Sequence, residues 1–485
     1  MTNEKAISRR LSKQENTIAR FLIPFGMLLL IAGGAVAQPA TTPSETNTPQ
    51  LPFYAFAPTP PMGWNSYDAF GDTVTEDEVM ANANYVKTNL LAHGWNYVVI
   101  DFRWYDPEPP GNDHLLNQLR TGAKLPADAF GRLLPAENRF PSSADGKGFK
   151  PLADRLHKMG LKFGVHYMRG IPEQAVRAKT PIADSQFTAA DAGDPSRPGE
   201  WCPDMFGVRS NAAGQAWYDS LFKQFADWGV DFVKVDDICP NYRTGESTMI
   251  RNAIDKCGRA IVYSISAGPP APRDADHVVT HVNMWRISTD FWDRWSSLNH
   301  QFDLMYPWHD FTGPGHFPDA DMIPFGHICI RSKAGGNDRM SRFSHDEQIM
   351  LMSFWCLAPS PLMLGGNLPD NTQWDLDLIS NDEVLALDQD SLVKPAKRVS
   401  QQGPPNARTE VWVRELKDGS RAVGLFNRGG NATEVTLNWD EAALSGKWIV
   451  RDLWQHKDLE NFDGKVTMQV PAHGAMLLKL SPTTK

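Results

Sequence analysis

Apolar and polar positions alternate along most of the chain in a pattern that changes period from segment to segment. Short apolar runs of the kind that form buried strands cover residues 97–101, 162–166, 232–236, 261–265 and 283–287, with a further candidate around 311–313. Segments with helical spacing lie between them, for example residues 149–159 and 214–228. Strands that take turns with helices predict βα units and a parallel sheet.

The number of these units distinguishes two architectures. Eight units can be counted from Met62 to Leu364, which is enough to close a (β/α)8 TIM barrel. A doubly wound sheet is the alternative, but no Gly-rich phosphate loop follows the first strand. We therefore predict an α/β chain with a catalytic barrel over residues 58–395.

The pattern changes after residue 395. Short alternating runs at 410–413, 422–426 and 475–480 are separated by turn residues. Such spacing predicts a small C-terminal antiparallel β-sandwich domain over residues 396–485.

The N-terminus has the features of an export signal. Basic residues precede an apolar run at 21–31, and Ala35-Val36-Ala37 supplies the small residues that signal peptidase requires. We expect a signal peptide at 1–37 and a linker at 38–57, rich in Pro, Thr and Ser up to residue 50. The apolar run is short for a membrane span, so we expect no stable membrane insertion after signal cleavage and a periplasmic or extracellular protein.

Charge and metal-ligand spacing exclude several functions. The formal net charge of −9 argues against nucleic acid as a partner. The five cysteines show no CxxC spacing, and the histidines form no HxH or HExxH motif, so no metal is expected. A bridge between Cys202 and Cys239 is conceivable in an exported protein. The pattern gives no oligomeric state.

Polar residues gather where the predicted strands end, on the face where barrel enzymes carry their active sites. They are Asp101, His166, Lys234, Asp236, Arg286, Asp290, Asp319 and Asp321. Hydrolysis of a neutral glycoside needs such a set, because one carboxylate attacks the anomeric carbon and another protonates the leaving oxygen. An isolated Asp at a strand end more often caps a turn or helix, so the argument depends on their number.

Four motifs in order resemble glycoside hydrolase family 27, the α-galactosidase and α-N-acetylgalactosaminidase family. They are PPMGWNSY at 60–67, KVD at 234–236, WRISTD at 285–290 and GPGHFPDADM at 313–322. The resemblance extends from about residue 58 to 480 and includes the sandwich.

The resemblance implies an exo-glycosidase of α-galactosidase type with a retaining mechanism, a carbohydrate substrate and no cofactor, and the N-terminal signal adds export. Asp236 would be the nucleophile and Asp290 the general acid and base, with their carboxyl groups roughly 5–5.5 Å apart. Sugar-binding roles would fall to Trp64, Asp101, Trp104, His166, Lys234, Ser266, Arg286 and Asp321. Asp237 is left outside the catalytic set, since it could cap the next helix.

Three departures from the family pattern concern the sugar. Phe102 stands where the family has the second of two acids, which removes a charge-assisted hydrogen bond at the far side of galactose. Ser266 resembles the N-acetylgalactosaminidase branch, and His166 replaces a tyrosine. The alternatives are therefore an α-glucan hydrolase of isomalto type, a β-L-arabinopyranosidase or an α-N-acetylgalactosaminidase with the same mechanism, or a carbohydrate-binding barrel without turnover.

Overall fold

The computed structural model describes residues 51–111, 124–199, 202–239 and 241–483. The predicted signal peptide and residues 38–50 of the predicted linker lie outside this range. Residues 51–57, also assigned to the linker, form a 3-10 helix at Pro52–Phe56 whose Phe53 and Tyr54 are buried. The hydroxyl of Tyr54 donates to the carbonyl oxygen of Val279 at 2.8 Å, so the packed part of the chain begins before residue 58.

Eight parallel strands form the central sheet, in the order β10-β9-β8-β7-β3-β2-β1-β13. Their bounds are β1 Met62–Asn65, β2 Tyr97–Ile100, β3 Lys162–Met168, β7 Phe232–Asp236, β8 Val262–Ile265, β9 Met284–Arg286, β10 Phe317–Asp319 and β13 Leu362–Leu364. Ile323, just after β10, forms a parallel bridge with Leu364 of β13. This bridge joins the two ends of the sheet, and the predicted (β/α)8 barrel is confirmed.

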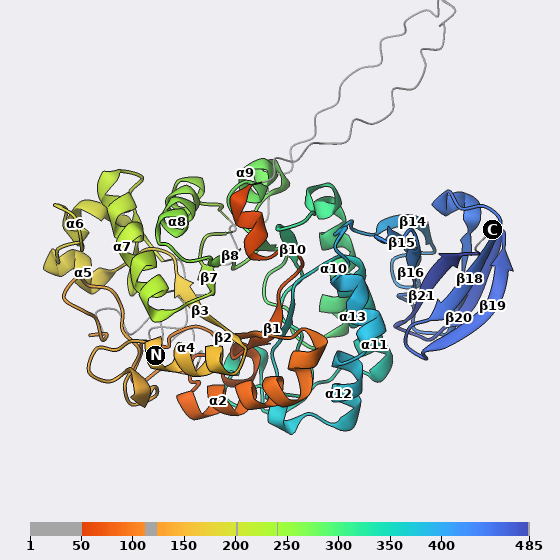
Figure 1. Cartoon of the computed structure of the whole chain (residues 1–485), viewed down its shortest axis with the longest axis horizontal. Coiled ribbons are helices and arrows are strands. Elements are labelled where there is room, and N and C mark those ends of the chain that lie inside the picture. The colour runs from red at the N-terminus through yellow and green to blue at the C-terminus, as the bar shows by residue number, and fades with distance from the viewer. Residues whose placement is uncertain (1–50, 112–123, 200–201, 240, 484–485) are drawn as a thin grey trace, which may run out of the picture. The chain divides into compact units, whose positions relative to one another are not determined.

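Helices follow the strands and cover the sheet (Figure 1). The longest is α7, Ala212–Trp228, where the Asn211 side chain caps the first turn by accepting from the Gly214 amide at 2.8 Å. The other helices are α1 Tyr67–Phe70, α2 Glu76–Tyr85, α4 Lys150–Lys158, α5 Glu173–Ala178, α6 Ala189–Ala192, α8 Thr244–Lys256, α9 Ala275–Val279, α10 Trp295–Met305, α11 His345–Leu357, α12 Gln373–Ile379 and α13 Asp382–Asp388.

One predicted strand is wrong. The aromatic run before residue 313 forms a 3-10 helix at Tyr306–Phe311, and the strand lies further along the chain, at β10. Pro307 stands in the first turn of that helix, where its fixed φ favours helical geometry over a strand.

An excursion between β3 and α7 carries a small antiparallel sheet. Its strands are β4 Ile171–Pro172, β5 Gly193–Pro198 and β6 Met205–Val208, in the order β4-β6-β5. The excursion begins where β3 ends, at the face of the barrel that carries the polar strand ends.

The C-terminal domain is all β, as predicted. A six-stranded antiparallel sheet has the order β14-β15-β16-β21-β18-β19, and β17 pairs with β20. The bounds are β14 Lys397–Gln402, β15 Thr409–Glu415, β16 Arg421–Asn427, β17 Thr433–Asn438, β18 Lys447–Asp452, β19 Lys457–Asp463, β20 Lys465–Val470 and β21 Gly474–Pro482. Leu425 and Leu478 of the large sheet pack with Val435 and Leu437 of the pair in one apolar core.

The five cysteines are all described and all are free thiols, so the conceivable bridge between Cys202 and Cys239 is not formed. Within the described ranges, we find no helix whose length and apolar character would let it cross a membrane.

Candidate active site

A cavity of about 140 Å³ opens at the carboxyl ends of the barrel strands. Six of the predicted site residues line it: Asp101, Lys234, Asp236, Arg286, Asp290 and Asp321. They come from four strands or the turns after them, so the barrel brings together side chains that are up to about 220 positions apart in the chain.

Asp236, the last residue of β7, has its carboxylate fixed by two donors. The Asp237 amide donates to Oδ1 at 2.7 Å, and His166 Nε2 lies 3.1 Å from Oδ2. Burial alone would raise the pKa of Asp236, but the His166 hydrogen bond and charge, Lys234 and the Asp237 amide lower it below its ordinary value. Asp236 is therefore held as an anion, the form that a nucleophile needs.

A buried ion pair lies beside it. Lys234 Nζ contacts Asp101 Oδ2 at 2.9 Å, and Asn65 Nδ2 donates to the same oxygen at 2.7 Å. Burial opposes ionisation of Asp101, yet Lys234, His166 and Asn65 lower its pKa. Lys234 has a raised pKa because Asp101 and Asp236 outweigh the effect of burial, so both groups stay charged.

On the opposite side, Arg286 joins two carboxylates. Its Nη2 lies 2.7 Å from Asp321 Oδ2 and 3.3 Å from Asp290 Oδ1. Burial, with the nearby carboxylates of Asp290 and Asp319, raises the pKa of Asp321 to about 6 against the lowering effect of Arg286. The Asp290 side chain is 49% exposed, which leaves it free to exchange protons with solvent and a leaving group.

Sequence reasoning missed several residues of the cavity wall. Tyr67 and Asp68 of α1 line it, as do Phe291 and Met322. Asp68 Oδ2 has no hydrogen-bond partner among the described residues, and burial raises the pKa of this carboxyl well above its ordinary value. An acid directly after the WNSY motif was a signal that could have identified Asp68.

Four predicted sugar-binding residues do not line the cavity: Trp64, Trp104, His166 and Ser266. Trp104 packs edge to face on Phe149 and Trp228, and its indole donates to the carbonyl oxygen of His166 at 2.7 Å. Trp64 is fully buried and donates to the carbonyl oxygen of Gly366. His166 does not line the cavity but forms a hydrogen bond with Asp236, which does.

Phe102 does line the cavity, next to Asp101. Its ring lies edge to face on His166, with centroids 5.4 Å apart, and its amide donates to Asp101 Oδ1 at 2.8 Å. The wall therefore has an apolar ring where the family pattern has a second carboxylate.

No group of His, Cys, Asp and Glu side chains within the described ranges has an arrangement that could hold a metal ion. The cavity wall presents several carboxylates together with one lysine and one arginine. An ionised acid held by hydrogen bonds and a half-exposed acid facing the same space suit hydrolysis of a glycosidic bond. The barrel and its cavity are those of a glycoside hydrolase.

Comparison with known proteins defines the family. Residues 210–390 match the family model "Alpha galactosidase A", and residues 406–480 match "Alpha galactosidase C-terminal beta sandwich domain". The α-galactosidase of Cyamopsis tetragonoloba is 30% identical over 433 residues, which cover 87% of this chain and 86% of that protein.

Two solved structures extend the comparison. A variant of a family 27 β-L-arabinopyranosidase from Geobacillus stearothermophilus, in complex with arabinose, is 44% identical, with a TM-score of 0.85 and coverage of 90% of this chain and 100% of that one. α-Galactosidase I from Mortierella vinacea is 25% identical with a TM-score of 0.67, and the match covers 87% of this chain and 97% of that one. The chain belongs to glycoside hydrolase family 27 and is a glycoside hydrolase of α-galactosidase type.

Proposed function

We propose that the protein is an exported, retaining exo-glycosidase that removes terminal α-linked galactose from a glycan. The observation that carries the proposal is that Asp236 and Asp290 line one cavity in different environments. Asp236 is buried and its pKa is lowered, while the Asp290 side chain is half exposed. The small cavity favours one terminal sugar ring, and the features of residues 1–37 support export.

The reaction has two steps. An Asp236 oxygen forms a bond to the anomeric carbon while the bond to the leaving oxygen breaks, and Asp290 gives its proton to that oxygen. Water then attacks the anomeric carbon, Asp290 takes a proton from it, and the ester bond to Asp236 breaks. Lys234 and Arg286 balance the negative charge of the carboxylates throughout.

A second candidate substrate is a β-L-arabinopyranoside. This sugar has the ring configuration of an α-D-galactopyranoside without the hydroxymethyl group. Phe102 lines the cavity where the family pattern has a second carboxylate, at the far side of the sugar. The Geobacillus relative is named a β-L-arabinopyranosidase. Both observations favour a site that binds the sugar without a hydrogen bond to the hydroxymethyl group of galactose.

The test is hydrolysis of p-nitrophenyl α-D-galactoside, β-L-arabinopyranoside, α-D-glucoside and N-acetyl-α-D-galactosaminide, followed by proton NMR. We expect turnover of one of the first two, with the first-formed sugar keeping the configuration of the substrate. Inverted product, or no hydrolysis of any glycoside by folded protein, would overturn the proposal. Preference for either of the last two would reassign the sugar.

The role of Asp236 has its own control. Asp236→Asn should lower kcat by several orders of magnitude, because the amide cannot form the glycosyl ester. Asp227→Asn changes the charge by the same amount at an exposed position of α7, where Asp227 pairs with Lys223, and should leave kcat unchanged.

A further inference from the structure

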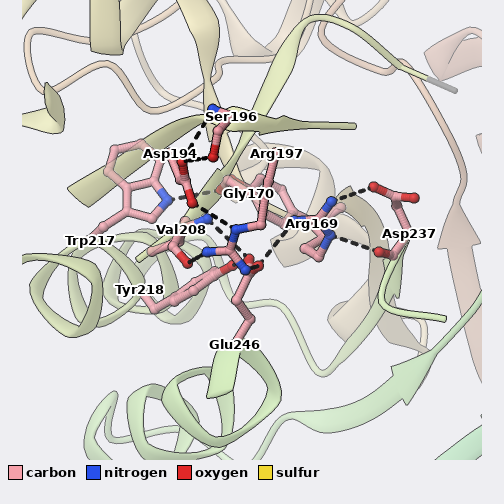
Figure 2. Close-up of polar contacts among 11 residues, drawn as sticks. Arg169, Gly170, Asp194, Ser196, Arg197, Val208, Trp217, Tyr218, Asp237 and Glu246 are labelled. Atoms are coloured by element: carbon pink, nitrogen blue, oxygen red, sulfur yellow. Dashed lines mark hydrogen bonds and ion pairs between the residues drawn. The ribbon is translucent and has the colours of Figure 1, made fainter. Parts of the chain in front are cut away.

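A buried group of charges is formed by Arg169, Asp237 and Glu246, next in the chain to the proposed nucleophile (Figure 2). Arg169 follows the last residue of β3, and its side chain is 1% exposed. It lies between Asp237, the residue after the proposed nucleophile, and Glu246 of α8. Neither Arg169, Asp237 nor Glu246 is among the residues that line the cavity.

Arg169 contacts the Asp236-Asp237 segment at three points. Its backbone amide donates to the carbonyl oxygen of Asp236 at 2.9 Å. Its Nε donates to the carbonyl oxygen of Asp237, and its Nη2 donates to Asp237 Oδ2, both at 2.7 Å. One arginine thus contacts the peptide groups on both sides of Asp237 and the side chain of Asp237 itself.

The backbone that Arg169 holds is an unusual one. Asp237 has φ of 60°, in the left-handed region that residues with a Cβ seldom adopt. The Asp237 amide donates to Asp236 Oδ1 at 2.7 Å, and the carbonyl oxygen of the same peptide group is the one that accepts from the Arg169 amide. The Asp237 carboxylate turns to Arg169 and does not cap α8, whose N-cap residue is Arg243.

Arg169 is itself held from the other side. Its Nη1 donates to Glu246 Oε1 at 3.0 Å, and Glu246 Oε2 accepts from the Tyr218 hydroxyl at 2.8 Å. The next residue is also fixed: Trp217 and Tyr167 donate to the carbonyl oxygen of Gly170 at 3.0 and 2.7 Å. Gly170 has φ of 118° and lies so close to Phe206 that a Cβ would be 2.2 Å from the Phe206 carbonyl oxygen.

We propose that Arg169 is a positioning residue for the hydrolysis. Its contacts hold Asp237 and the peptide groups on both sides of it in place, so that the Asp237 amide keeps its hydrogen bond to Asp236 and the carboxylate of Asp236 keeps its orientation and charge. The inference rests on the proposed function, in which Asp236 is the nucleophile.

Other groups also act on Asp236, and none of them depends on Arg169 directly. The charged and titratable side chains that face it are His166 of β3, Lys234 of β7, Arg286 of β9, Tyr67 of α1 and Cys239 after β7. The carboxylates of Asp101, Asp290 and Asp321 line the same cavity. All remain when Arg169 is changed, so the amide of Asp237 is the one donor to Asp236 that should be affected.

The experiment compares Arg169→Lys with Arg197→Lys. Lysine keeps the charge, but one ammonium group cannot reproduce the fork that contacts Asp237 and Glu246. Arg197 belongs to the outer end of the same network: it donates to Asp194 Oδ2 at 2.7 Å, reaches only to 3.9 Å from Glu246, and its side chain is 39% exposed. Arg197→Lys is therefore the matched control.

For Arg169→Lys we expect kcat to fall by about 10- to 100-fold with little change in KM, since small misplacements of reacting groups have effects of this size. The acid limb of the kcat/KM profile should move to higher pH, because Asp236 loses a donor that favours its ionised form. Arg197→Lys should match the wild type in both. If folded Arg169→Lys keeps the wild-type kcat and pH profile, the inference is overturned.

A second variant and a second readout cover the other outcomes. Glu246→Gln replaces Arg169→Lys in the experiment if that variant does not fold. It keeps the shape of the side chain but removes the charge that holds Arg169, and it should also move the acid limb of kcat/KM to higher pH. The Asp236 carboxyl pKa can also be read by carbon NMR of Asp-labelled protein, assigned with Asp236→Asn. This needs no substrate, so an inactive wild type would contradict the proposed function alone, whereas an unshifted pKa in both variants would contradict the role of Arg169.

Discussion

Lys234 Nζ and Asp101 Oδ2 are 2.9 Å apart, and the two side chains are only 14% and 2% exposed. They belong to β7 and to the turn after β2, which are separated in the sheet by β3. The pair therefore links two barrel strands that are not neighbours, at the end of the barrel where the cavity lies.

We expect Lys234→Met to destabilise the protein by about 3–5 kcal/mol, because it leaves the Asp101 carboxylate buried without its cation. Adding Asp101→Asn to Lys234→Met should restore much of the melting temperature but not the activity. Scanning calorimetry of both single variants and the double variant measures this coupling. Equal melting temperatures for Lys234→Met and the double variant would contradict the cost assigned to an unpaired Asp101 carboxylate.

His166 should set the acid limb of the activity profile. It lies 3.1 Å from Asp236 Oδ2 and helps to lower the pKa of Asp236 below its ordinary value. Without this donor the pKa of Asp236 rises, and since the ionised form is the active one, activity at low pH is lost earlier. The acid limb of kcat/KM for His166→Leu should therefore move to higher pH, while His166→Gln, which keeps an N–H donor, should move less. A limb that does not move in His166→Leu would assign it to another group.

The role of Asp290 as general acid can be tested by how the rate depends on the leaving group. Asp290→Ala removes the proton donor, so alkyl glycosides, which need protonation, should lose about 10²- to 10⁴-fold in kcat/KM. A dinitrophenyl glycoside, whose leaving oxygen needs no proton, should lose much less in that step. Rates measured across a series of aryl leaving groups test this, and an equal loss for every substrate would remove Asp290 from the acid role.

Phe102 should control the choice between galactose and arabinopyranose. Phe102→Asp places a carboxylate beside Asp101, at the side of the cavity where the family pattern has its second acid. We expect the ratio of kcat/KM for the α-galactoside over the β-L-arabinopyranoside to rise by about tenfold or more. Phe102→Leu changes the ring without adding a charge and serves as the control. A ratio unchanged in Phe102→Asp would place sugar selection elsewhere.

The sequence predicted the barrel well because its strands are apolar runs that end in charge. The runs that became β2, β3, β7 and β9 end within two or three residues of the predicted limits. The carboxyl ends of parallel strands share one face, so six of the seven Asp, Lys and Arg residues that line the cavity could be predicted without coordinates.

Local backbone geometry explains two differences from the predicted site. It places some residues in the cavity wall that were not predicted, and it directs some predicted aromatic side chains away from the cavity. Arg103 has φ of 60°, and after this turn the ring of Trp104 lies against Phe149 and Trp228 in the core. Tyr67 and Asp68 belong to a single short helical turn after β1. Hydrophobic periodicity predicts which face of a regular element is buried, but it does not predict the direction of a side chain within an irregular turn.

The 3-10 helix at Pro52–Phe56 bears on what counts as the smallest independently folding piece of this protein. The guanidinium of Arg251 lies 4.5 Å from the centroid of the Phe53 ring, and Tyr54 packs on His316 with ring centroids 4.7 Å apart. A chain shortened to begin at residue 58, where the homologous barrel motif starts, would uncover a buried cation and one side of the Gly-rich loop before β10. The short helix is therefore part of the folded barrel domain. A fusion partner should be attached before residue 52.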